Sequence, residues 1–319
     1  MLTNATILFG HPAFQLGSEY QSRGIGQNFI EARTFEDVEA QLPNADVLVV
    51  SKLWRNDWID RGPRLKFIQS VSAGTEQYDR ARIAAKGIRL ASAQGVNTGA
   101  VGDHAIGLIL SLTRHLHLAR DRQRDHAWRT NISDLSRREQ ELNQQTMVLV
   151  GLGPIGQRIA DLAKAFGMRV LGVNRSGKCS HPSIEAAVSI SCLLEVLPHA
   201  DFLVLACPLT PETQGLIDDA RLKAMKPSAT LINVARGRIV DQPALIAALQ
   251  SGTIAGAGLD CFHDEPLPAI SPLWDMANVV ITPHSAGETR SYEIRVIDIL
   301  LENLKRLASG ETVLHNQIV

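Results

Sequence analysis

A strand that leads into closely spaced glycines is the feature that most constrains how this chain can fold. The apolar run at residues 147–151 opens the pattern G-x-G-x-x-G, whose glycines are Gly151, Gly153 and Gly156. In this pattern the first glycine allows a tight turn, the second lets backbone approach a pyrophosphate, and the third lets helix pack on strand. The amphipathic helix that follows presents N–H groups and a positive dipole end to phosphate. We therefore predict a dinucleotide site, with a purely structural glycine-rich turn as the alternative.

Around this motif the chain alternates short β-rich runs with amphipathic helices, which predicts parallel, doubly wound sheets. One series ends near residues 97–99, a second begins at Thr146, and a helix at 289–308 is left over. With 319 residues the chain has room for about two domains. We expect the last helix to return to the first domain. The expected strands are 5–9, 45–51, 65–71, 88–91, 147–151, 169–173, 202–206, 230–233, 256–260 and 279–282.

Between the two series, residues 101–128 are expected to form one long helix, apolar at first and then highly charged. Its second half holds five Arg and two Asp between Arg114 and Arg129. A basic nucleic-acid face is one interpretation, and a solvated or subunit-contact helix is the other. The whole chain carries 32 Lys+Arg and 33 Asp+Glu, a net charge of −1, which favours the second interpretation. His115 and His117 are two apart, so they do not face one ligand on a helix, and we expect no metal site.

Composition also bears on where the protein works. The chain has no apolar run of the roughly 18–20 residues that a membrane span needs. Its N-terminus lacks a basic segment before a hydrophobic stretch, so no signal peptide is expected. The four cysteines are scattered and form no Cys-x-x-Cys pair. We interpret them as reduced thiols and expect a cytoplasmic protein with neither membrane nor nucleic-acid partners.

Three polar residues follow strands of the second series, where ligands bind in open α/β sheets. They are Arg236, Glu265 and His284. The planar fork of an arginine suits the carboxylate of a 2-oxo acid. A histidine can give a proton to a carbonyl oxygen, and a carboxylate beside it fixes its tautomer. From residue type alone, a surface charge, a structural histidine and a solvated turn remain the alternatives.

Several longer motifs point to one family. They are Ser72-Ala73-Gly74, Val101-Gly102-Asp103-His104, Gly151 to Gly156, Pro208-Leu209-Thr210-Pro211-Glu212-Thr213, Asn233 to Gly237, Leu259 to Pro266, and Pro283-His284. In their order and spacing, the stretch from about Ser70 to Asn303 resembles the D-isomer-specific 2-hydroxyacid dehydrogenases, which include glyoxylate/hydroxypyruvate reductases, phosphoglycerate dehydrogenases and D-lactate dehydrogenases. The resemblance implies a Rossmann cofactor domain at 97–288, inserted in a discontinuous flavodoxin-like substrate domain of residues 1–96 and 289–319.

The resemblance also implies roles. His284 resembles the family's acid/base, Glu265 its carboxylate partner, and Arg236 the arginine that holds the substrate's carboxylate and carbonyl. Ala73 and Gly74 resemble the loop that caps the substrate carboxylate. The implied activity is hydride transfer between a nicotinamide and C2 of a small 2-oxo or 2-hydroxy acid, in a homodimer. Implied cofactor contacts are Gly151, Gly153, Pro154, Ile155, Gly156, Asn174, Arg175, Ser176, Cys207, Pro208, Val234, Asp260, His284 and Ala286.

The end of the second strand of this series predicts the choice of cofactor. An acidic residue there binds the ribose of NAD, whereas an arginine suits the 2′-phosphate of NADP. The chain has Asn174, Arg175 and Ser176 at this point, with Lys178 close behind and no carboxylate. We therefore predict NADP, with NAD held through Asn174 as the alternative.

Two further questions stay open at the level of sequence. Corepressors that resemble this family sense nucleotides without a need for turnover, and they can keep the Arg, Glu and His. Within the sequence given, the ends are short, which favours the enzyme. Trp54 follows a strand of the first series, so it could reach a substrate pocket or pack within its own domain.

Overall fold

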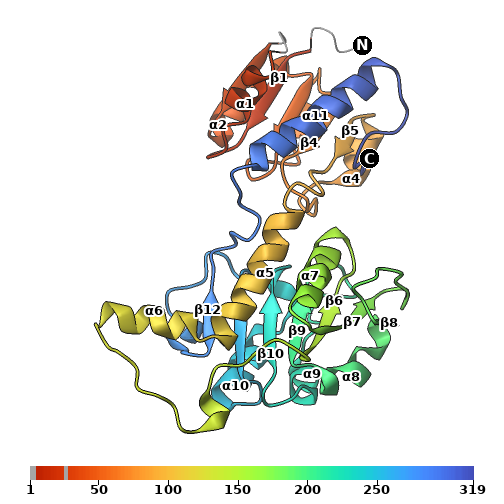
Figure 1. Cartoon of the computed structure of the whole chain (residues 1–319). Coiled ribbons are helices and arrows are strands. Elements are labelled where there is room, and N and C mark those ends of the chain that lie inside the picture. Colours follow the sequence, from red (N-terminus) through yellow and green to blue (C-terminus); the bar gives the residue numbers. More distant parts are fainter. Residues whose placement is uncertain (1–4, 25–27) are drawn as a thin grey trace. The chain divides into compact units, whose positions relative to one another are not determined.

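The computed structural model describes residues 5–24 and 28–319, which form two compact units. The discontinuous unit combines Met1–Asn97 with Thr289–Val319, and the continuous unit is Thr98–Glu288 (Figure 1). Each unit is built around one parallel sheet, of five strands in the first and seven in the second. The prediction of two parallel-sheet α/β domains is therefore confirmed.

The sheet of the discontinuous unit has the strand order β2-β1-β3-β4-β5. This is the doubly wound order of flavodoxin-like folds, as expected. Strands β1, β3 and β4 are buried along their whole length, so both faces of the sheet need cover. The strands are β1 (Ile7–Gly10), β2 (Phe29–Ala32), β3 (Val47–Val50), β4 (Phe67–Ser70) and β5 (Arg89–Ala91).

Helices cover both faces of this sheet. On one face, α1 (Leu16–Ser22) and α11 (Tyr292–Ala308) share a core with the strands, and Leu300 is among its fully buried residues. On the other face, the core includes Val38, Trp58 and Ile83 from α2 (Phe35–Gln41), α3 (Trp58–Arg61) and α4 (Arg80–Ala85). The last helix, predicted at 289–308, thus packs with strands from the start of the chain.

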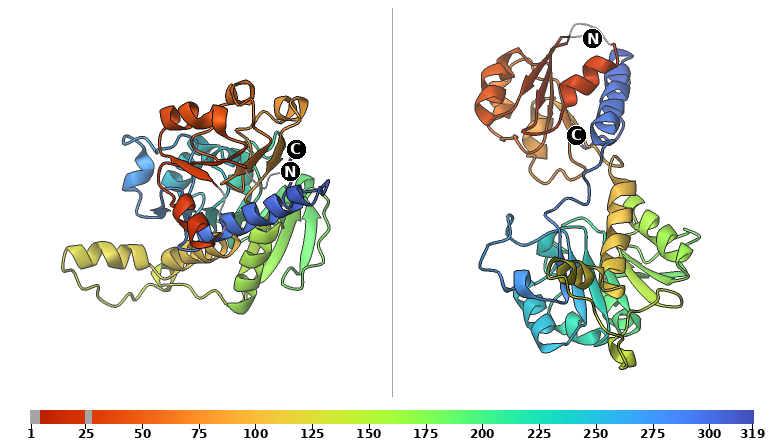
Figure 2. Two further views of the ribbon diagram at one scale, coloured as in Figure 1. Left: turned by 90° about the horizontal axis from the view of Figure 1, so that it is seen from above. Right: turned by 60° about the vertical axis from the view of Figure 1, so that its left-hand side comes forward.

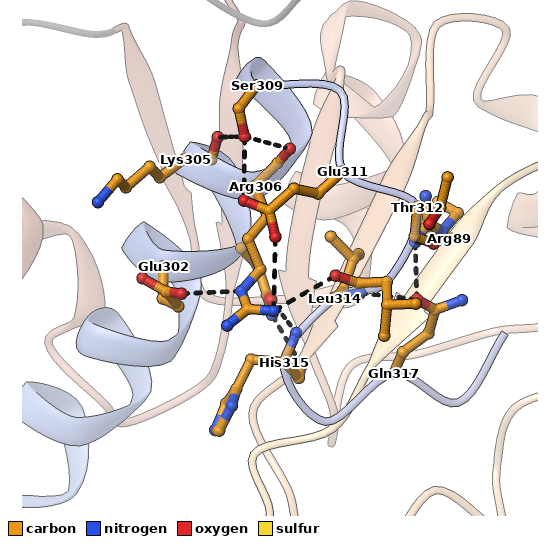
Figure 3. A network of polar contacts seen from close by, with 12 residues as sticks. Arg89, Glu302, Lys305, Arg306, Ser309, Glu311, Thr312, Leu314, His315 and Gln317 are labelled. Atoms are coloured by element: carbon orange, nitrogen blue, oxygen red, sulfur yellow. Dashed lines mark hydrogen bonds and ion pairs between the residues drawn. The ribbon is translucent and has the colours of Figure 1, made fainter.

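Within the discontinuous unit, polar contacts link the C-terminal segment to α11 and to β5 (Figure 3). Arg306 on α11 donates to Glu302 at 2.8 Å and forms an ion pair with Glu311 at 3.6 Å. Arg89 at the start of β5 donates to the side chain of Gln317 at 2.6 Å. Gln317 also forms an antiparallel bridge with Ala91, so the tail pairs along the outer edge of β5.

The sheet of the continuous unit has the order β12-β11-β10-β9-β6-β7-β8. Counted from β6, this is the Rossmann order 3-2-1-4-5-6 with β12 added at one edge, which confirms the predicted fold. The strands are β6 (Thr146–Val150), β7 (Arg169–Asn174), β8 (Ala186–Ser189), β9 (Phe202–Leu205), β10 (Thr230–Asn233), β11 (Gly256–Leu259) and β12 (Val279–Ile281).

Two helical layers cover this sheet as well. On one side, α5 (Thr98–Thr113) and α7 (Pro154–Ala165) contribute to one core. On the other side, α8 (Leu193–Val196), α9 (Asp219–Ala224) and α10 (Gln242–Ser251) contribute to a second core. Short 3-10 turns lie at Leu42–Asn44, Leu135–Arg137, Ile190–Cys192, Leu197–His199, Gly237–Ile239 and Pro272–Asp275.

The prediction of one long helix over 101–128 is wrong. Helix α5 ends at Thr113, and α6 (Leu116–Arg124) begins after His115, whose φ of 51° is left-handed. Helix α5 buries an apolar stripe, whereas α6 has no buried residue, so no core contact carries one helix into the next. In Figure 1 and in the left view of Figure 2, α6 extends away from the sheet of its own unit. No helix in the described part of the chain is long and apolar enough to cross a membrane.

Candidate active site

The glycine-rich turn between β6 and α7 has the backbone that the motif requires. Gly151 has a φ of +100°, and a Cβ there would lie 2.6 Å from the backbone of Ala206 and Cys207. A Cβ on Gly156 would lie 2.0 Å from the carbonyl oxygen of Gly151. Only glycine fits at these two positions, because any side chain would collide with backbone.

The middle glycine is different, since a Cβ on Gly153 would meet nothing within 4 Å. Gly153 and Pro154 are exposed, and they begin the twelve-residue helix α7. Backbone N–H groups at such a helix end suit a pyrophosphate. Beside the turn, Cys207 is buried and Pro208 is exposed, and burial raises the pKa of the Cys207 thiol to about 11. These residues therefore fit a dinucleotide.

The loop after β7 is organised by Asn174. Its amide oxygen accepts hydrogen bonds from Gly177 N at 2.7 Å and from Ser176 Oγ at 3.2 Å. Its amide nitrogen donates to the carbonyl of Lys178 at 2.8 Å. Asn174 thus shapes the loop, and the exposed Arg175 and Lys178 project from it as cations.

Arg175 also lies near the loop that follows β9. The pKa of the Glu212 carboxyl is lowered first by a hydrogen bond with Thr210, and the charge of Arg175 adds to that effect. No described residue forms a hydrogen bond or an ion pair with the Arg175 guanidinium. The loop after β7 therefore presents a cation and lacks a carboxylate of its own.

Glu265 and His284 meet at the carboxyl edge of the sheet. His284 Nδ1 lies 2.7 Å from Glu265 Oε2, and the side chains are 46% and 36% exposed. The other oxygen of Glu265 accepts from Phe262 N at 2.9 Å, which fixes the carboxylate. An ionised carboxylate only accepts, so Nδ1 carries the hydrogen, and the opposite nitrogen, Nε2, has no hydrogen-bond partner among the described residues.

Arg236 follows β10 and is half-buried. Its carbonyl accepts from Asn233 Nδ2 at 3.0 Å, and its Nη1 donates to the carbonyl of Ala235 at 2.8 Å. A Cβ on the next residue, Gly237, would lie 1.9 Å from the backbone of Phe262. The Arg236 turn therefore packs directly against the loop that holds Glu265.

The buried thiol of Cys261 shows that these charges lie close together. Burial raises its pKa, the carboxylates of Asp260 and Glu265 raise it further, and the guanidinium of Arg236 lowers it. The sheet edge thus gathers one arginine, two carboxylates and His284 from the ends of three adjacent strands. That arrangement can hold an anion and move a proton.

Asp260 holds the loop that carries His284. Its buried carboxylate accepts from Thr282 Oγ1 at 2.6 Å, from Ser285 N at 2.9 Å and from Ala286 N at 3.0 Å. His284 itself has a φ of 54°, which is uncommon for a residue other than glycine. Both oxygens of the Asp260 carboxylate thus already accept hydrogen bonds within the protein. The predicted contact of Asp260 with the cofactor would have to form in addition to these bonds. Val234, also predicted near the cofactor, follows β10 and is half-buried.

Sequence reasoning missed two members of this network. Thr282 Oγ1 is contacted by His104 Nε2 at 2.9 Å, from helix α5. Both residues lie inside or beside matched motifs, but no spacing rule connects positions 104 and 282. Only the packing of α5 on the sheet brings them together.

In the discontinuous unit, Ala73 and Gly74 follow β4 and are half-buried. No described residue accepts a hydrogen bond from the backbone N–H of either one. The turn is fixed just before them, where Ser72 N donates to Ser70 Oγ at 3.1 Å. This loop therefore offers two N–H donors at the carboxyl edge of its sheet.

Trp54 lies in the core of the discontinuous unit. Its side chain is 8% exposed, and its ring centroid is 5.0 Å from that of Tyr78. The indole N–H donates to Asn56 Oδ1 at 2.9 Å. Of the two interpretations, packing within its own domain is the one that these contacts support.

Among the described residues, no cluster of three His, Cys, Asp or Glu side chains could hold a metal ion.

Comparison with known proteins defines the class to which this fold and site belong. The sequence model described as "D-isomer specific 2-hydroxyacid dehydrogenase, NAD binding domain" matches residues 106–286, more than half of the chain. The glyoxylate reductase of Pyrococcus furiosus is 36% identical over 282 residues, which cover 86% of this chain and 83% of the relative.

Solved structures agree with that match. The TT0316 protein from Thermus thermophilus has a TM-score of 0.85 and 33% identity, over 98% of this chain and 100% of that one. A D-isomer specific 2-hydroxyacid dehydrogenase from Xanthobacter autotrophicus, solved with NADPH and MES, has a TM-score of 0.83 and 27% identity, over 99% and 98%. The chain belongs to the D-isomer-specific 2-hydroxyacid dehydrogenase family, and the family and nicotinamide-cofactor predictions are confirmed at that level.

Proposed function

We propose that this protein reduces small 2-oxo acids to D-2-hydroxy acids, reversibly and with a preference for NADP(H). The observation that carries the proposal is the Glu265–His284 pair, 2.7 Å apart at the sheet edge that also holds Arg236. Relatives named glyoxylate reductase support glyoxylate or hydroxypyruvate as the type of substrate. The continuous unit would bind the cofactor, and the discontinuous unit would contribute to binding the substrate.

The cofactor would be held by the glycine turn, the loop after β7 and the strand ends around Val234, Asp260 and Ala286. When bound, its nicotinamide supplies or accepts the hydride at C2 of the acid. His284 Nε2 gives its proton to the substrate oxygen during reduction and takes it back during oxidation. Glu265 stabilises the imidazolium and keeps the ring oriented.

Arg236 would orient the substrate. A guanidinium binds a planar carboxylate through two parallel hydrogen bonds and can also polarise the neighbouring carbonyl. The N–H groups of Ala73 and Gly74, which no described residue uses, are further donors that suit the same carboxylate. The carboxylate of the substrate would thus meet only hydrogen-bond donors, namely the Arg236 guanidinium and these N–H groups. Such a set of donors suits the carboxylate of a 2-oxo acid.

We further propose a cytoplasmic homodimer, with no nucleic-acid or membrane partner. Three large apolar side chains on and after α6 are strongly exposed: Leu116 at 54%, Trp128 at 97% and Leu135 at 74%. Large apolar side chains exposed on one segment suit a subunit contact, because contiguous exposed apolar surface is typical of interaction sites. The subunit-contact interpretation of the segment agrees with this surface.

Cofactor preference is tested by steady-state rates with NADPH and NADH. We expect NADP(H) to be preferred in kcat/KM by at least about tenfold, some 1.4 kcal/mol. Arg175→Ala should erase most of that preference by weakening NADPH alone. Arg169→Ala, which removes a cation from the opposite end of β7, is the matched control and should keep the preference. A parent enzyme that uses NADH as well as NADPH refutes the NADP assignment.

The substrate class is tested with a panel of 2-oxo acids of graded size, beginning with glyoxylate and hydroxypyruvate. Oxidation of NADPH is followed by its absorbance with the parent protein and with His284→Ala. Turnover that requires both the 2-oxo acid and His284 supports the proposal. A pure protein that binds NADPH and oxidises it with none of these acids contradicts the proposal.

A further inference from the structure

The Asp260 network reaches beyond the strand ends to helix α5. His104 Nε2 lies 2.9 Å from Thr282 Oγ1 and 3.6 Å from Asp260 Oδ1, and the His104 side chain is 24% exposed. None of these three residues is the acid/base of the proposed reaction. Thr282, however, is only two residues before His284, and the two are joined by a hydrogen bond from His284 N to the Thr282 carbonyl at 3.0 Å.

Counting hydrogens fixes the direction of this chain of contacts. Thr282 Oγ1 has a single hydrogen, and it donates that hydrogen to Asp260 at 2.6 Å. Toward His104, the threonine oxygen can therefore only accept. His104 Nε2 must carry a hydrogen and act as the donor, and the nearby Asp260 carboxylate favours the same tautomer.

The network fixes the His284 loop from both sides. Before His284 it holds the Thr282 side chain, and after His284 it holds the N–H groups of Ser285 and Ala286. His284 has a left-handed φ of 54°. A conformation of this kind persists only where its surroundings determine it. The hydrogen bonds to Asp260 hold the loop in this conformation. The hydrogen bond from His104 to Thr282 adds to them from helix α5, outside the loop.

His104 also links distant parts of the chain. Helix α5 begins at Thr98, the first residue of the continuous unit, and the His284 loop lies just before Glu288, the last one. The apolar stripe of α5, which includes Ala105 and Ile109, already anchors the helix to its core. The helix is therefore held by its apolar contacts. The hydrogen bond from His104 instead fixes the side chain of Thr282.

We propose that His104 is a positioning residue, which acts through Thr282 and Asp260 to hold His284 beside Glu265. This proposal rests on the proposed function, since it assigns a purpose to the position of His284. The charged and titratable groups that the structure gathers around the loop are Glu265, Asp260, Arg236, the buried thiol of Cys261 and His104 itself. A displacement of about 1 Å at a reacting group can cost roughly 100-fold in rate.

The test compares His104→Leu, which removes the donor, with His104→Gln, whose side-chain N–H can still reach Thr282. We expect His104→Leu to lower kcat by roughly 10- to 100-fold while KM for NADPH stays nearly constant. His104→Gln should recover most of the loss. Thr282→Val, which breaks the next link with little change in volume, should resemble His104→Leu.

The matched control is His117→Leu. His117 on α6 also contacts the chain ahead of β12, with Nε2 3.0 Å from the Ala277 carbonyl, but it does not contact the Asp260 network. We expect this variant to lose some thermal stability and to keep kcat. A drop in kcat for His117→Leu equal to that for His104→Leu would mean that both histidines serve stability alone, which overturns the proposal.

A second measurement reads the position of His284 without turnover. The imidazole signal of His284 is titrated by NMR in the cofactor-free protein and assigned by its loss in His284→Ala. In His104→Leu the titration midpoint should move to lower pH, because the imidazolium is held less well beside Glu265. An unchanged kcat or an unchanged midpoint, in His104→Leu or in Thr282→Val, overturns the proposal. A parent protein that reduces no 2-oxo acid removes the proposed function, while the NMR comparison still decides the role of His104.

Discussion

Two histidines follow strands at the carboxyl edges of the two sheets, and their surroundings are opposite. His284, after β12, is 46% exposed and pairs with Glu265 at 2.7 Å. His11, directly after β1, is 3% exposed, and its Nδ1 accepts from the N–H groups of Ala13 and Phe14 at 3.2 and 2.9 Å. Burial lowers the pKa of His11 to about 4, and the charges of Lys52 and Arg33 contribute. Residue type and place in the fold are alike, so the partners decide which histidine can transfer a proton.

The largest expected difference is in activity. His284→Ala should lower kcat by about 10²–10⁴, because a positioned general acid contributes that much. Its melting temperature should change little, since the side chain is half exposed. His11→Ala should do the reverse and lower thermal stability, because it strands two N–H donors and opens a buried site. A His284→Ala enzyme with kcat within tenfold of the parent removes His284 from the reaction.

The next largest effect concerns the arginine at each edge. Arg236→Lys should lower kcat/KM by roughly 10- to 100-fold and spare NADPH affinity, because an ammonium cannot remake a bidentate contact. Arg33→Lys should mainly lower stability, since Arg33 donates to the backbone carbonyl of His11 at 3.3 Å. Steady-state kinetics and thermal melting of both variants check this. Near-normal kcat/KM in Arg236→Lys excludes Arg236 from the site.

A smaller effect isolates the carboxylate of the His284 pair. An anion favours the protonated imidazole and a neutral amide does not. In Glu265→Gln, the reduction rate should therefore begin to fall at a lower pH than in the parent, by roughly one pH unit. The pH profile of kcat/KM for reduction measures this. If the profile does not move, the pairing has no role in the reaction, whatever His284→Ala shows.

The last effect, on stability and not on activity, is the pH dependence that comes from His11. Its pKa is about 4 in the folded protein and 6.5 when unperturbed, so the unfolded chain binds the proton more readily. The contribution of His11 is thus complete above about pH 6.5 and is lost as the pH falls toward 4. His11→Asn keeps an acceptor for the two N–H groups and does not titrate. Denaturant unfolding should show a shallower loss of stability between pH 6.5 and 4 for the variant, and equal slopes contradict the assignment.

The fold was largely predictable because buried parallel strands and amphipathic helices leave strong patterns in the sequence. The missed strands, β2 and β8, are the outer strands next to β1 and β7, and they are only partly buried. Their side chains therefore lack the continuous apolar run of inner strands. The break between α5 and α6 was missed because a charged stretch keeps helical propensity after its core contacts end.

The candidate site was predictable where local motifs carry it, and not where tertiary packing does. Glu265 and His284 both lie in motifs that match the family, and the structure places them within hydrogen-bond distance of each other. The sequence has no pattern that connects His104 with Thr282, since they come from a helix and a strand end that are 178 positions apart. The role of His11 could not be predicted from the sequence either, because only the folded loop brings the N–H groups of Ala13 and Phe14 to its ring.

The proposed reaction is tested most directly by identifying the product that the purified protein forms from hydroxypyruvate and NADPH. Chiral chromatography separates the two glycerate enantiomers, and His284→Ala serves as the inactive control. We expect D-glycerate, formed in equal amount to the NADPH consumed, and none from His284→Ala. L-glycerate, or D-glycerate formed equally well by His284→Ala, would rule out the proposed reaction.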